Sequence, residues 1–216
     1  MKLGVFDSGI GGKAIADTLA EDFPEAAIMY VHDSEHVPYG GRQQDEIIQL
    51  TETAITPLLT AGCDCIVLAC NTATAAAIEY LRTKYPDQKF VGLEPMVKPA
   101  VAVTKTGTIA VFATPYTLSS ERYLNLKKQF ARNTTILEPD CSAWASMIEQ
   151  DAVDEAHIEQ IVDDSIENGA DVIVLACTHY HWIKDLIVTR TNGRATVIDP
   201  SEAISRQVAS LLGVSL

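Results

Sequence analysis

Two cysteines stand at the end of the same apolar run in two parts of the chain. Cys70 lies in CDCIVLACNTATAAA and Cys177 in ADVIVLACTHYHWI. The segments that end at these cysteines, GCDCIVLAC and GADVIVLAC, are identical at seven of nine positions and lie 107 residues apart. LGVFDS at 3–8 and IAVFAT at 109–114 form a second similar pair at nearly the same offset. Repetition over this distance predicts a chain built from two related halves.

A thiol at the end of a buried strand is well placed for chemistry. In open parallel α/β sheets, ligands bind at the carboxyl ends of the strands. We expect both cysteines to open a helix, whose N-terminal dipole favours a thiolate. Polar residues follow each thiol, Asn71-Thr72 in one half and Thr178-His179 in the other. One such cysteine would be interpreted as a small buried side chain, but two at equivalent positions indicate function.

Two thiols on opposite sides of a substrate suit the inversion of a carbon centre. One thiolate removes a proton, and the other thiol returns a proton on the opposite face, so the product is the mirror image. Because one sulfur must be ionised while the other is protonated, each needs a neighbouring group that tunes it. Asp7 ends the first predicted strand and is expected beside Cys70, and His179 is expected beside Cys177.

Strand-like and helix-like patterns alternate along the whole chain, which predicts an α/β fold. The predicted strands are KLGVF, AIMYV, CIVLA, KFVGL, TIAVF, TTILE, DVIVLA and ATVID. We expect two similar lobes, each a mainly parallel sheet flanked by helices, with the active site in the cleft between them. GLEPMVKPA, with its two prolines, is the predicted crossing between lobes. The first lobe would comprise residues 1–94 plus 200–216, and the second lobe residues 95–199.

Charge and hydropathy exclude several classes of protein. The chain has 216 residues, 47% of them apolar, and a net charge of −13 from 29 acidic and 16 basic residues. A surface that binds nucleic acid or an anionic membrane needs a basic stripe, so neither partner is expected. No apolar run approaches the roughly 20 residues that span a bilayer. The N-terminal residues lack the pattern of a signal peptide, which predicts a cytoplasmic location.

The remaining cysteines carry no recognisable ligand pattern. Cys63, Cys65 and Cys141 lack the polar surroundings of the other two and are interpreted as buried packing residues. Five cysteines without a secretion signal argue against a disulfide framework. Because no CxxC pair occurs, we expect no metal site.

Several motifs, in order along nearly the whole chain, resemble those of one known family. GVFDSGIGG, PYGGR at 38–42, ACNTATA, EPMVKPA, ATPYTLSSERY, ACTHY and VIDPSEA are similar to motifs of the glutamate racemases in the aspartate/glutamate racemase superfamily. The resemblance implies a cofactor-independent interconversion of L- and D-glutamate that supplies D-glutamate for peptidoglycan and the cell wall.

The resemblance also implies roles for individual residues. Cys70, supported by Asp7, would serve one enantiomer, and Cys177, supported by His179, would serve the other. Glu149 in SAWASMIEQD falls where the family has a glutamate near the second thiol and its histidine. The implied ligands of the substrate are Asp7, Ser8, Pro38, Tyr39, Gly40, Asn71, Thr72, Thr114, Thr117, Thr178 and His179.

The sequence departs from the family pattern in places and leaves alternatives open. His181-Trp182 replaces the usual Pro-Leu, and CSAWASMIE is bulkier and more polar than its counterpart. Relatives usually continue beyond LLGVSL, where this sequence ends. One alternative function is racemisation of another acidic amino acid such as aspartate, and another is a non-catalytic paralogue that binds an amino acid. The expected partner is a small-molecule substrate, and formation of a homodimer is left open.

Overall fold

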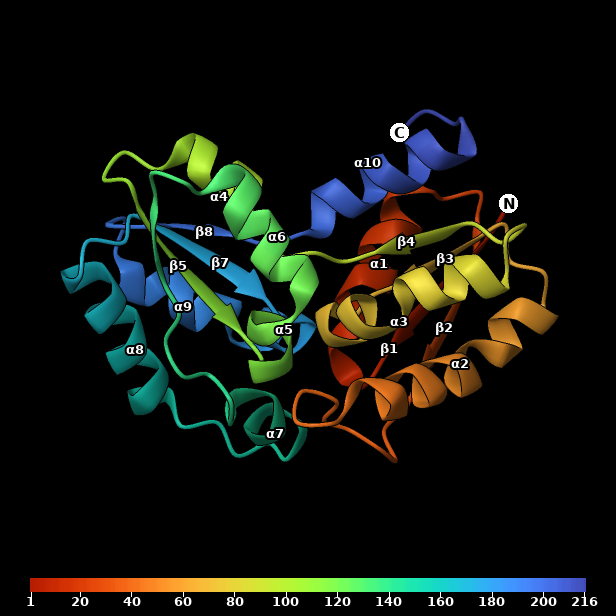
Figure 1. Ribbon diagram of the computed structural model, residues 1–216, viewed down its shortest axis with the longest axis horizontal. Helices are drawn as coiled ribbons and strands as arrows, with labels where there is room; N and C mark the ends of the chain where they lie inside the picture. Colours follow the sequence, from red (N-terminus) through yellow and green to blue (C-terminus); the bar gives the residue numbers. More distant parts are fainter. The chain divides into compact units, whose positions relative to one another are not determined.

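The chain forms two compact units of similar size. The computed structural model describes residues 1–216. Unit 1 contains Met1–Glu94 together with Pro200–Leu216, and unit 2 contains Pro95–Asp199. Figure 1 shows each unit as a sheet with helices packed around it. None of the helices combines the length and apolar character needed to cross a bilayer.

Unit 1 is built on a four-stranded sheet in the order β2-β1-β3-β4. All three strand pairs are parallel. Its elements are β1 (Lys2–Asp7), the 3₁₀ turn η1 (Ile10–Gly12), α1 (Lys13–Asp22), β2 (Ala27–His32), α2 (Gln44–Thr60), β3 (Cys65–Leu68), α3 (Asn71–Lys84), β4 (Phe90–Gly92) and α10 (Ser201–Leu212).

Unit 2 repeats this plan, with a parallel sheet in the order β6-β5-β7-β8. Its elements are α4 (Val97–Val103), β5 (Thr108–Ala113), α5 (Pro115–Ser119), α6 (Glu121–Phe130), β6 (Thr135–Leu137), α7 (Trp144–Glu149), α8 (Glu155–Glu167), β7 (Val172–Ala176), the 3₁₀ segment η2 (Thr178–Ile183), α9 (Lys184–Thr191) and β8 (Thr196–Ile198). Since β5 takes the place of β1 and β7 that of β3, the predicted α/β fold with two similar lobes is confirmed.

The glycine shared by the two repeated segments ends a helix in each unit. Gly62 follows α2 with a φ of +64°, and Gly169 follows α8 with a φ of +95°. In both places the next residue donates its N–H back to a carbonyl in the last helical turn, from Cys63 to Leu58 and from Ala170 to Ser165. This left-handed helix end favours glycine, which has no Cβ to clash.

The shared aspartate fixes the backbone that leads into the first strand of each sheet. The Asp64 carboxylate accepts the N–H of Lys2 at 2.7 Å. The Asp171 carboxylate accepts the N–H groups of Lys105 and Thr106 at 2.6 and 3.1 Å, and the Thr104 hydroxyl at 2.5 Å. The repeated Gly and Asp therefore serve the scaffold, which leaves the cysteine as the repeated residue that is a candidate for chemistry.

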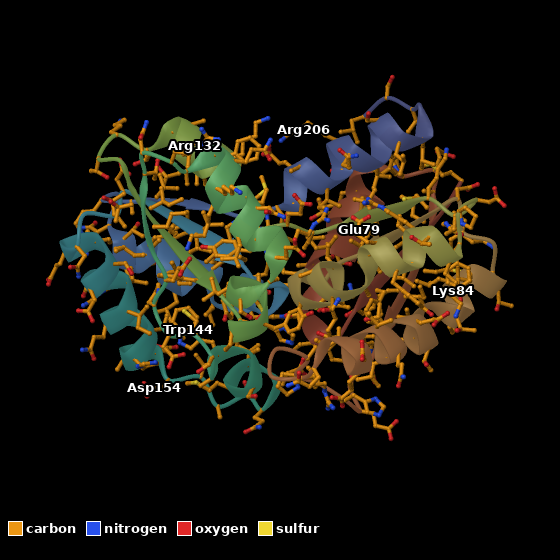
Figure 2. All side chains as sticks on the ribbon, in the orientation of Figure 1. Glu79, Lys84, Arg132, Trp144, Asp154 and Arg206 are labelled. Carbon is orange, nitrogen blue, oxygen red and sulfur yellow. The ribbon has the colours of Figure 1, made fainter.

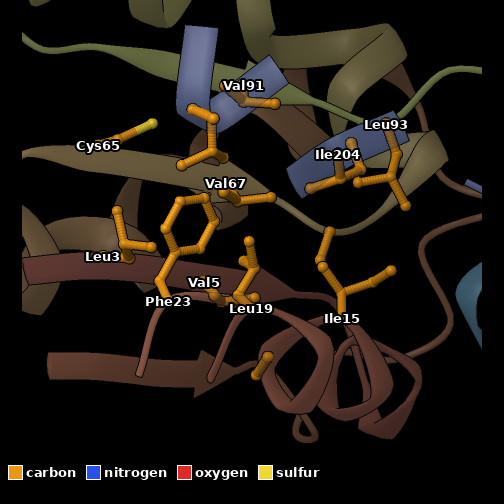
Figure 3. Packing of buried hydrophobic residues seen from close by; sticks show 14 residues of the cluster. Leu3, Val5, Ile15, Leu19, Phe23, Cys65, Val67, Val91, Leu93 and Ile204 are labelled. Carbon is orange, nitrogen blue, oxygen red and sulfur yellow. The ribbon is translucent and has the colours of Figure 1, made fainter. Parts of the chain in front are cut away.

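In each unit, two helices cover one face of the sheet. One of the two comes, in the chain, directly after the last strand of the other unit. In unit 1, α1 packs on Leu3 and Val67 together with α10, which follows β8 and contributes Ile204 and Val208 (Figure 3). In unit 2, α6 shares the corresponding face with α4, which follows β4. The two units thus exchange one helix each.

The opposite face of the unit 1 sheet is covered by α2 and α3. A Cβ on Gly4 of β1 would lie 3.0 Å from a methyl of Leu58 in α2. A Cβ on Gly92 of β4 would lie 2.5 Å from Thr74 and Ile78 in α3. Glycine at these two strand positions therefore lets both helices approach the sheet closely.

The two cysteines at the strand ends open helices of different kinds. Cys70 does open an α-helix, α3. Cys177 opens the 3₁₀ segment η2, and the following α-helix begins only at Lys184. Both cysteines therefore open a helix, as expected, but the helix at Cys177 is a short 3₁₀ segment.

We predict that Asp171→Asn lowers the free energy of unfolding at pH 7 by about 1–2 kcal/mol, because several donors lose a charged acceptor. Asp64→Asn should cost less, since Asp64 accepts a single backbone N–H. Urea denaturation of both variants beside the unsubstituted protein checks this order. Equal losses, or none, would contradict the structural role.

The loss of unfolding free energy in Asp171→Asn should also depend on pH. Burial opposes ionisation of Asp171, but its hydrogen bonds from Thr104, Lys105 and Thr106 together hold the pKa of the carboxyl below its ordinary value. A depressed folded-state pKa stabilises the protein above the unfolded pKa of about 3.9, and the effect is lost as the pH falls further. The difference between the variant and the unsubstituted protein should therefore shrink below roughly pH 4.

Candidate active site

The thiol of Cys70 lies where β3 passes into α3. The Ala69 N–H donates to the Phe6 carbonyl at 2.7 Å, so pairing with β1 continues to the end of the strand. The Thr74 hydroxyl donates to the Leu68 carbonyl at 3.1 Å and holds the first turn of α3 against it. Cys70 is the N-cap of α3, and its sulfur accepts the Ala73 N–H at 3.4 Å. A sulfur in this position is stabilised as a thiolate.

Asp7 and Ser8 lie at the end of β1, the strand that pairs with β3 in front of this thiol. Continuing the register of Phe6 with Leu68 puts Ser8 level with Cys70, and their Oγ and Sγ atoms are 3.3 Å apart. Asp7 is fully buried, and one of its carboxylate oxygens accepts the Gly12 N–H at 2.6 Å. Unit 1 therefore sets the Ser8 hydroxyl against the thiol, and the preceding residue, Asp7, is a buried carboxylate held by a backbone N–H.

The loop after β2 brings Pro38, Tyr39 and Gly40 to the same edge of the sheet. Asp33 extends the strand pairing, since its N–H donates to the Asp7 carbonyl at 3.2 Å. The Asp33 carboxylate accepts the Tyr39 hydroxyl at 2.7 Å. Burial, and then the bond to Asp33, raise the pKa of Tyr39, so the phenol stays protonated. Asp33 was not predicted as a site residue. Its position directly after a strand could have indicated it.

Asn71 and Thr72, at the start of α3, complete the candidate site residues of unit 1. Both side chains are buried. The amide oxygen and nitrogen of Asn71 have no hydrogen-bond partner in the structure. Buried polar atoms are nearly always paired, so an unpartnered amide beside the thiol indicates a place for a polar ligand.

The thiol of Cys177 faces an imidazole that is itself held by a carboxylate. Cys177 directly follows β7, and its sulfur lies 3.7 Å from Nδ1 of His179. Nε2 of His179 lies 2.5 Å from a carboxylate oxygen of Glu149 at the end of α7. Both Cys177 and His179 are buried. The carboxylate orients the ring and stabilises its charged form.

Hydroxyl groups also lie at the strand ends of unit 2, where the second thiol is. Thr114 extends β5 and caps α5, and its hydroxyl accepts the Thr117 N–H at 3.4 Å. The Thr114 hydroxyl also donates to that of Thr117 at 3.0 Å. Thr178 is buried beside Cys177. These groups can hydrogen-bond an anion without a positively charged side chain, which agrees with the acidic composition.

The structure thus gathers the predicted site residues into two sets, one in each unit. The unit 1 set is Asp7, Ser8, Pro38, Tyr39, Gly40, Cys70, Asn71 and Thr72. The unit 2 set is Thr114, Thr117, Glu149, Cys177, Thr178 and His179. Each set lies at the carboxyl ends of its parallel strands, the edge at which such sheets bind ligands.

The other three cysteines are buried within their units. Burial raises the pKa of Cys65 to about 12 and also raises the pKa values of Cys63 and Cys141. These thiols therefore stay protonated near neutral pH. Their protonation supports the interpretation that they pack in the interior rather than react.

Comparison with known proteins places this geometry in a family. Residues 13–208 match the model of the Asp/Glu/hydantoin racemases. The chain is 37% identical to a glutamate racemase of Ectopseudomonas mendocina over 98% of its own length and 82% of the relative's.

Solved structures of glutamate racemases are similar as well. The enzyme of Escherichia coli in complex with L-glutamate and the activator UDP-MurNAc-Ala matches with a TM-score of 0.90 and 26% identity, over 98% of this chain and 82% of that one. The enzyme of Francisella tularensis in complex with D-glutamate matches with a TM-score of 0.80 and 29% identity, over 98% and 81%. The chain belongs to the Asp/Glu/hydantoin racemase family, among its glutamate racemases.

Proposed function

We propose that the protein is a glutamate racemase that inverts Cα with two thiols and no cofactor. One observation carries this proposal: equivalent strand ends in two similar units each hold a buried thiol with its own acid–base neighbours. A protein that only binds an amino acid has no need of two such thiols. The glutamate bound in the Escherichia coli and Francisella tularensis structures supports the substrate.

Each thiol would work as a one-proton base for one enantiomer. A thiolate at Cys70 takes the Cα proton, and the resulting carbanion takes a proton from the Cys177 thiol on its opposite face. The product is the other enantiomer, and the charge has moved from one sulfur to the other. The reverse reaction uses the same groups in the opposite order, so no external acid or base is consumed.

The two thiols have different neighbours. This suits a mechanism in which each sulfur alternates between thiolate and thiol. Cys70 has a helix N-terminus that favours its thiolate, and Asp7 beside Ser8 as a group that can accept and return a proton. Cys177 has His179, whose ring can carry a proton or a positive charge under the control of Glu149. Each sulfur can therefore be either ionised or protonated when substrate arrives.

The chemistry of the lining groups suits a small dicarboxylate. The buried hydroxyls of Ser8, Thr72, Thr114 and Thr178 can donate to carboxylate oxygens. The unpartnered amide of Asn71 can both donate and accept, as an amino acid with ammonium and carboxylate groups requires. We propose that the D-glutamate formed supplies peptidoglycan synthesis. We also propose a cytoplasmic location, since five free buried cysteines suit a reducing compartment.

The pure protein should exchange the Cα proton of glutamate with solvent and invert it. We would incubate L- and D-glutamate and both enantiomers of aspartate in D2O. Cα deuterium would be followed by NMR and the enantiomers by chiral chromatography. Inversion of glutamate alone supports the proposal, and inversion of aspartate alone would change the substrate. If a folded sample exchanges none of them, the proposed function is wrong.

Cys70→Ser and Cys177→Ser should each reduce racemisation by roughly a thousandfold or more, because a serine hydroxyl does not ionise in this range. Cys63→Ser, also buried but outside both sets, is the matched control and should keep its activity. Circular dichroism verifies that the variants fold. Full racemase activity in either active-site variant would exclude the two-thiol mechanism.

Gly12→Ala should impair catalysis by displacing Asp7. A Cβ on Gly12 would lie 2.4 Å from Cβ of Asp7, which is too close for either to remain in place. A shift of about 1 Å at a catalytic group costs roughly a hundredfold in rate, and we expect a loss of that order in kcat. Gly41→Ala is the matched control, since no atom lies within 4 Å of a Cβ there. Equal activity of the two variants would show that the position of Asp7 is not critical.

A further inference from the structure

Three buried aromatic rings connect the elements that carry the second thiol and its partners. Trp144, the first residue of α7, contacts Phe112 of β5 edge-on, with ring centroids 5.3 Å apart at 83°. It also contacts Tyr180 of η2, with centroids 5.2 Å apart at 65°. All three side chains are fully buried. Figure 2 labels Trp144 within unit 2. Edge-to-face pairs of this kind prefer a defined geometry over a range of sliding contacts.

A single carbonyl group joins the same two elements by hydrogen bonds. The Cys141 carbonyl accepts the hydroxyl of Tyr180 at 3.1 Å. It also accepts the backbone N–H of Trp144 at 3.2 Å. The start of α7 and the side chain from η2 therefore share one acceptor. Burial raises the pKa of Tyr180 far above its ordinary value, so its hydroxyl remains a donor at every pH of interest.

Both ends of this connection lead directly to the proton-transfer groups. Tyr180 follows His179 in the chain, and its N–H donates to the Cys177 carbonyl at 3.1 Å. Glu149 is the last residue of α7, a helix of only six residues that begins at Trp144. A helix this short is not stable by itself and takes its position from its contacts. The position of Glu149 relative to His179 thus depends on how the start of α7 is attached to η2.

The indole of Trp144 has one buried polar atom without a hydrogen-bond partner. Its Nε1 has no hydrogen-bond partner and is buried, which is unfavourable. A phenylalanine would avoid that unpaired donor but would fill less space between Phe112 and Tyr180. The larger ring therefore contributes contact with both neighbours at the expense of a hydrogen bond.

We propose that Trp144 and Tyr180 are positioning residues for the second thiol: the stack of Phe112, Trp144 and Tyr180, with the Cys141 carbonyl, holds α7 on η2 and keeps Glu149 on His179. This inference rests on the proposed two-thiol racemase for its effect on catalysis. Its structural part, the dependence of the His179–Glu149 hydrogen bond on Tyr180 and Trp144, can be measured without any turnover.

Kinetic isotope effects separate the two thiols. The enantiomers of glutamate have equal free energy, so damage to either thiol lowers kcat/KM equally in both directions. Deuterium at Cα slows only the step that removes it. If the groups around Cys177 are disturbed, removal by Cys177 becomes more rate-limiting and its isotope effect rises. Return of a proton by Cys177 limits the opposite direction, so the isotope effect on removal by Cys70 falls.

Tyr180→Phe is the main variant, because it removes one hydroxyl and leaves the ring. Tyr123→Phe is its matched control: Tyr123 is equally buried in unit 2, and its hydroxyl donates to Glu138 at 2.6 Å. Trp144→Phe tests the stack separately. We expect kcat/KM to fall roughly ten- to hundredfold in Tyr180→Phe and Trp144→Phe, through misplacement of Glu149 and His179. The isotope effects of the two enantiomers should move in opposite directions in both, and neither should move in Tyr123→Phe.

The second readout is the proton NMR signal of the His179 ring N–H that bonds Glu149. Glu149→Gln, which removes the charged acceptor, assigns this signal. We expect the signal to shift upfield or broaden in Tyr180→Phe and Trp144→Phe and to stay in place in Tyr123→Phe. If the signal responds this way in a protein that racemises nothing, the positioning role stands and the proposed function fails. If the signal and both isotope effects are unchanged in Tyr180→Phe, or the isotope effects move together, the positioning role is wrong.

Discussion

Parallel pairing of β1 with β3 in unit 1, and of β5 with β7 in unit 2, is the constraint on which both sets of candidate site residues depend. In a parallel pair the carboxyl ends of both strands reach the same edge. The register of Phe6 with Leu68 brings Ser8 level with Cys70, and that of Ala113 with Ala176 brings Thr114 level with Cys177. A shift of one residue in either pair would turn the side chains to the opposite face of the sheet. The apolar runs that fix this register are therefore as necessary to the chemistry as the thiols.

The same scaffold supports two different ways of controlling a thiol. In unit 1 the sulfur caps an α-helix, and the strand beside it supplies Asp7. In unit 2 the corresponding strand position is Ala113, and a 3₁₀ segment follows the sulfur. The imidazole of His179, held by Glu149, stands in for both missing features, because it can supply a positive charge and a transferable proton. Two similar backbones thus place one thiol at the N-terminus of an α-helix and the other beside an imidazole.

Local sequence patterns predicted the strands and their order, but they did not predict side-chain contacts between segments that are distant in the sequence. A strand such as the one before Cys70 is a short apolar run bounded by polar residues. Such a run can be recognised from a few consecutive residues. Asp33 was missed because its bond to Tyr39 depends on the path of a loop. The pairing of His179 with Glu149 spans thirty residues and was indicated only by resemblance to a family.

Short elements account for the other differences from prediction. α5 and α7 have five and six residues, too few for a helical period to emerge from the sequence. The segment after Cys177 was expected to begin a helix, and the helix that begins there is of the 3₁₀ type. Its bulky residues Tyr180 and Ile183 are instead buried at 3₁₀ spacing, three positions apart.

The exchange of α4 and α10 between the units sets the order in which the protein can be completed during synthesis. Unit 2 is one continuous segment, and all of its helices and strands have been made once the ribosome passes residue 199. Unit 1 has all its strands by residue 94, but the face that carries Val67 and Val91 lacks α10 until the last helix emerges. Unit 1, whose strands are made first, thus lacks α10 until unit 2 has been made. A nascent chain arrested before that point presents an apolar sheet face that α1 covers only in part, and exposed apolar surface is the kind that chaperones bind.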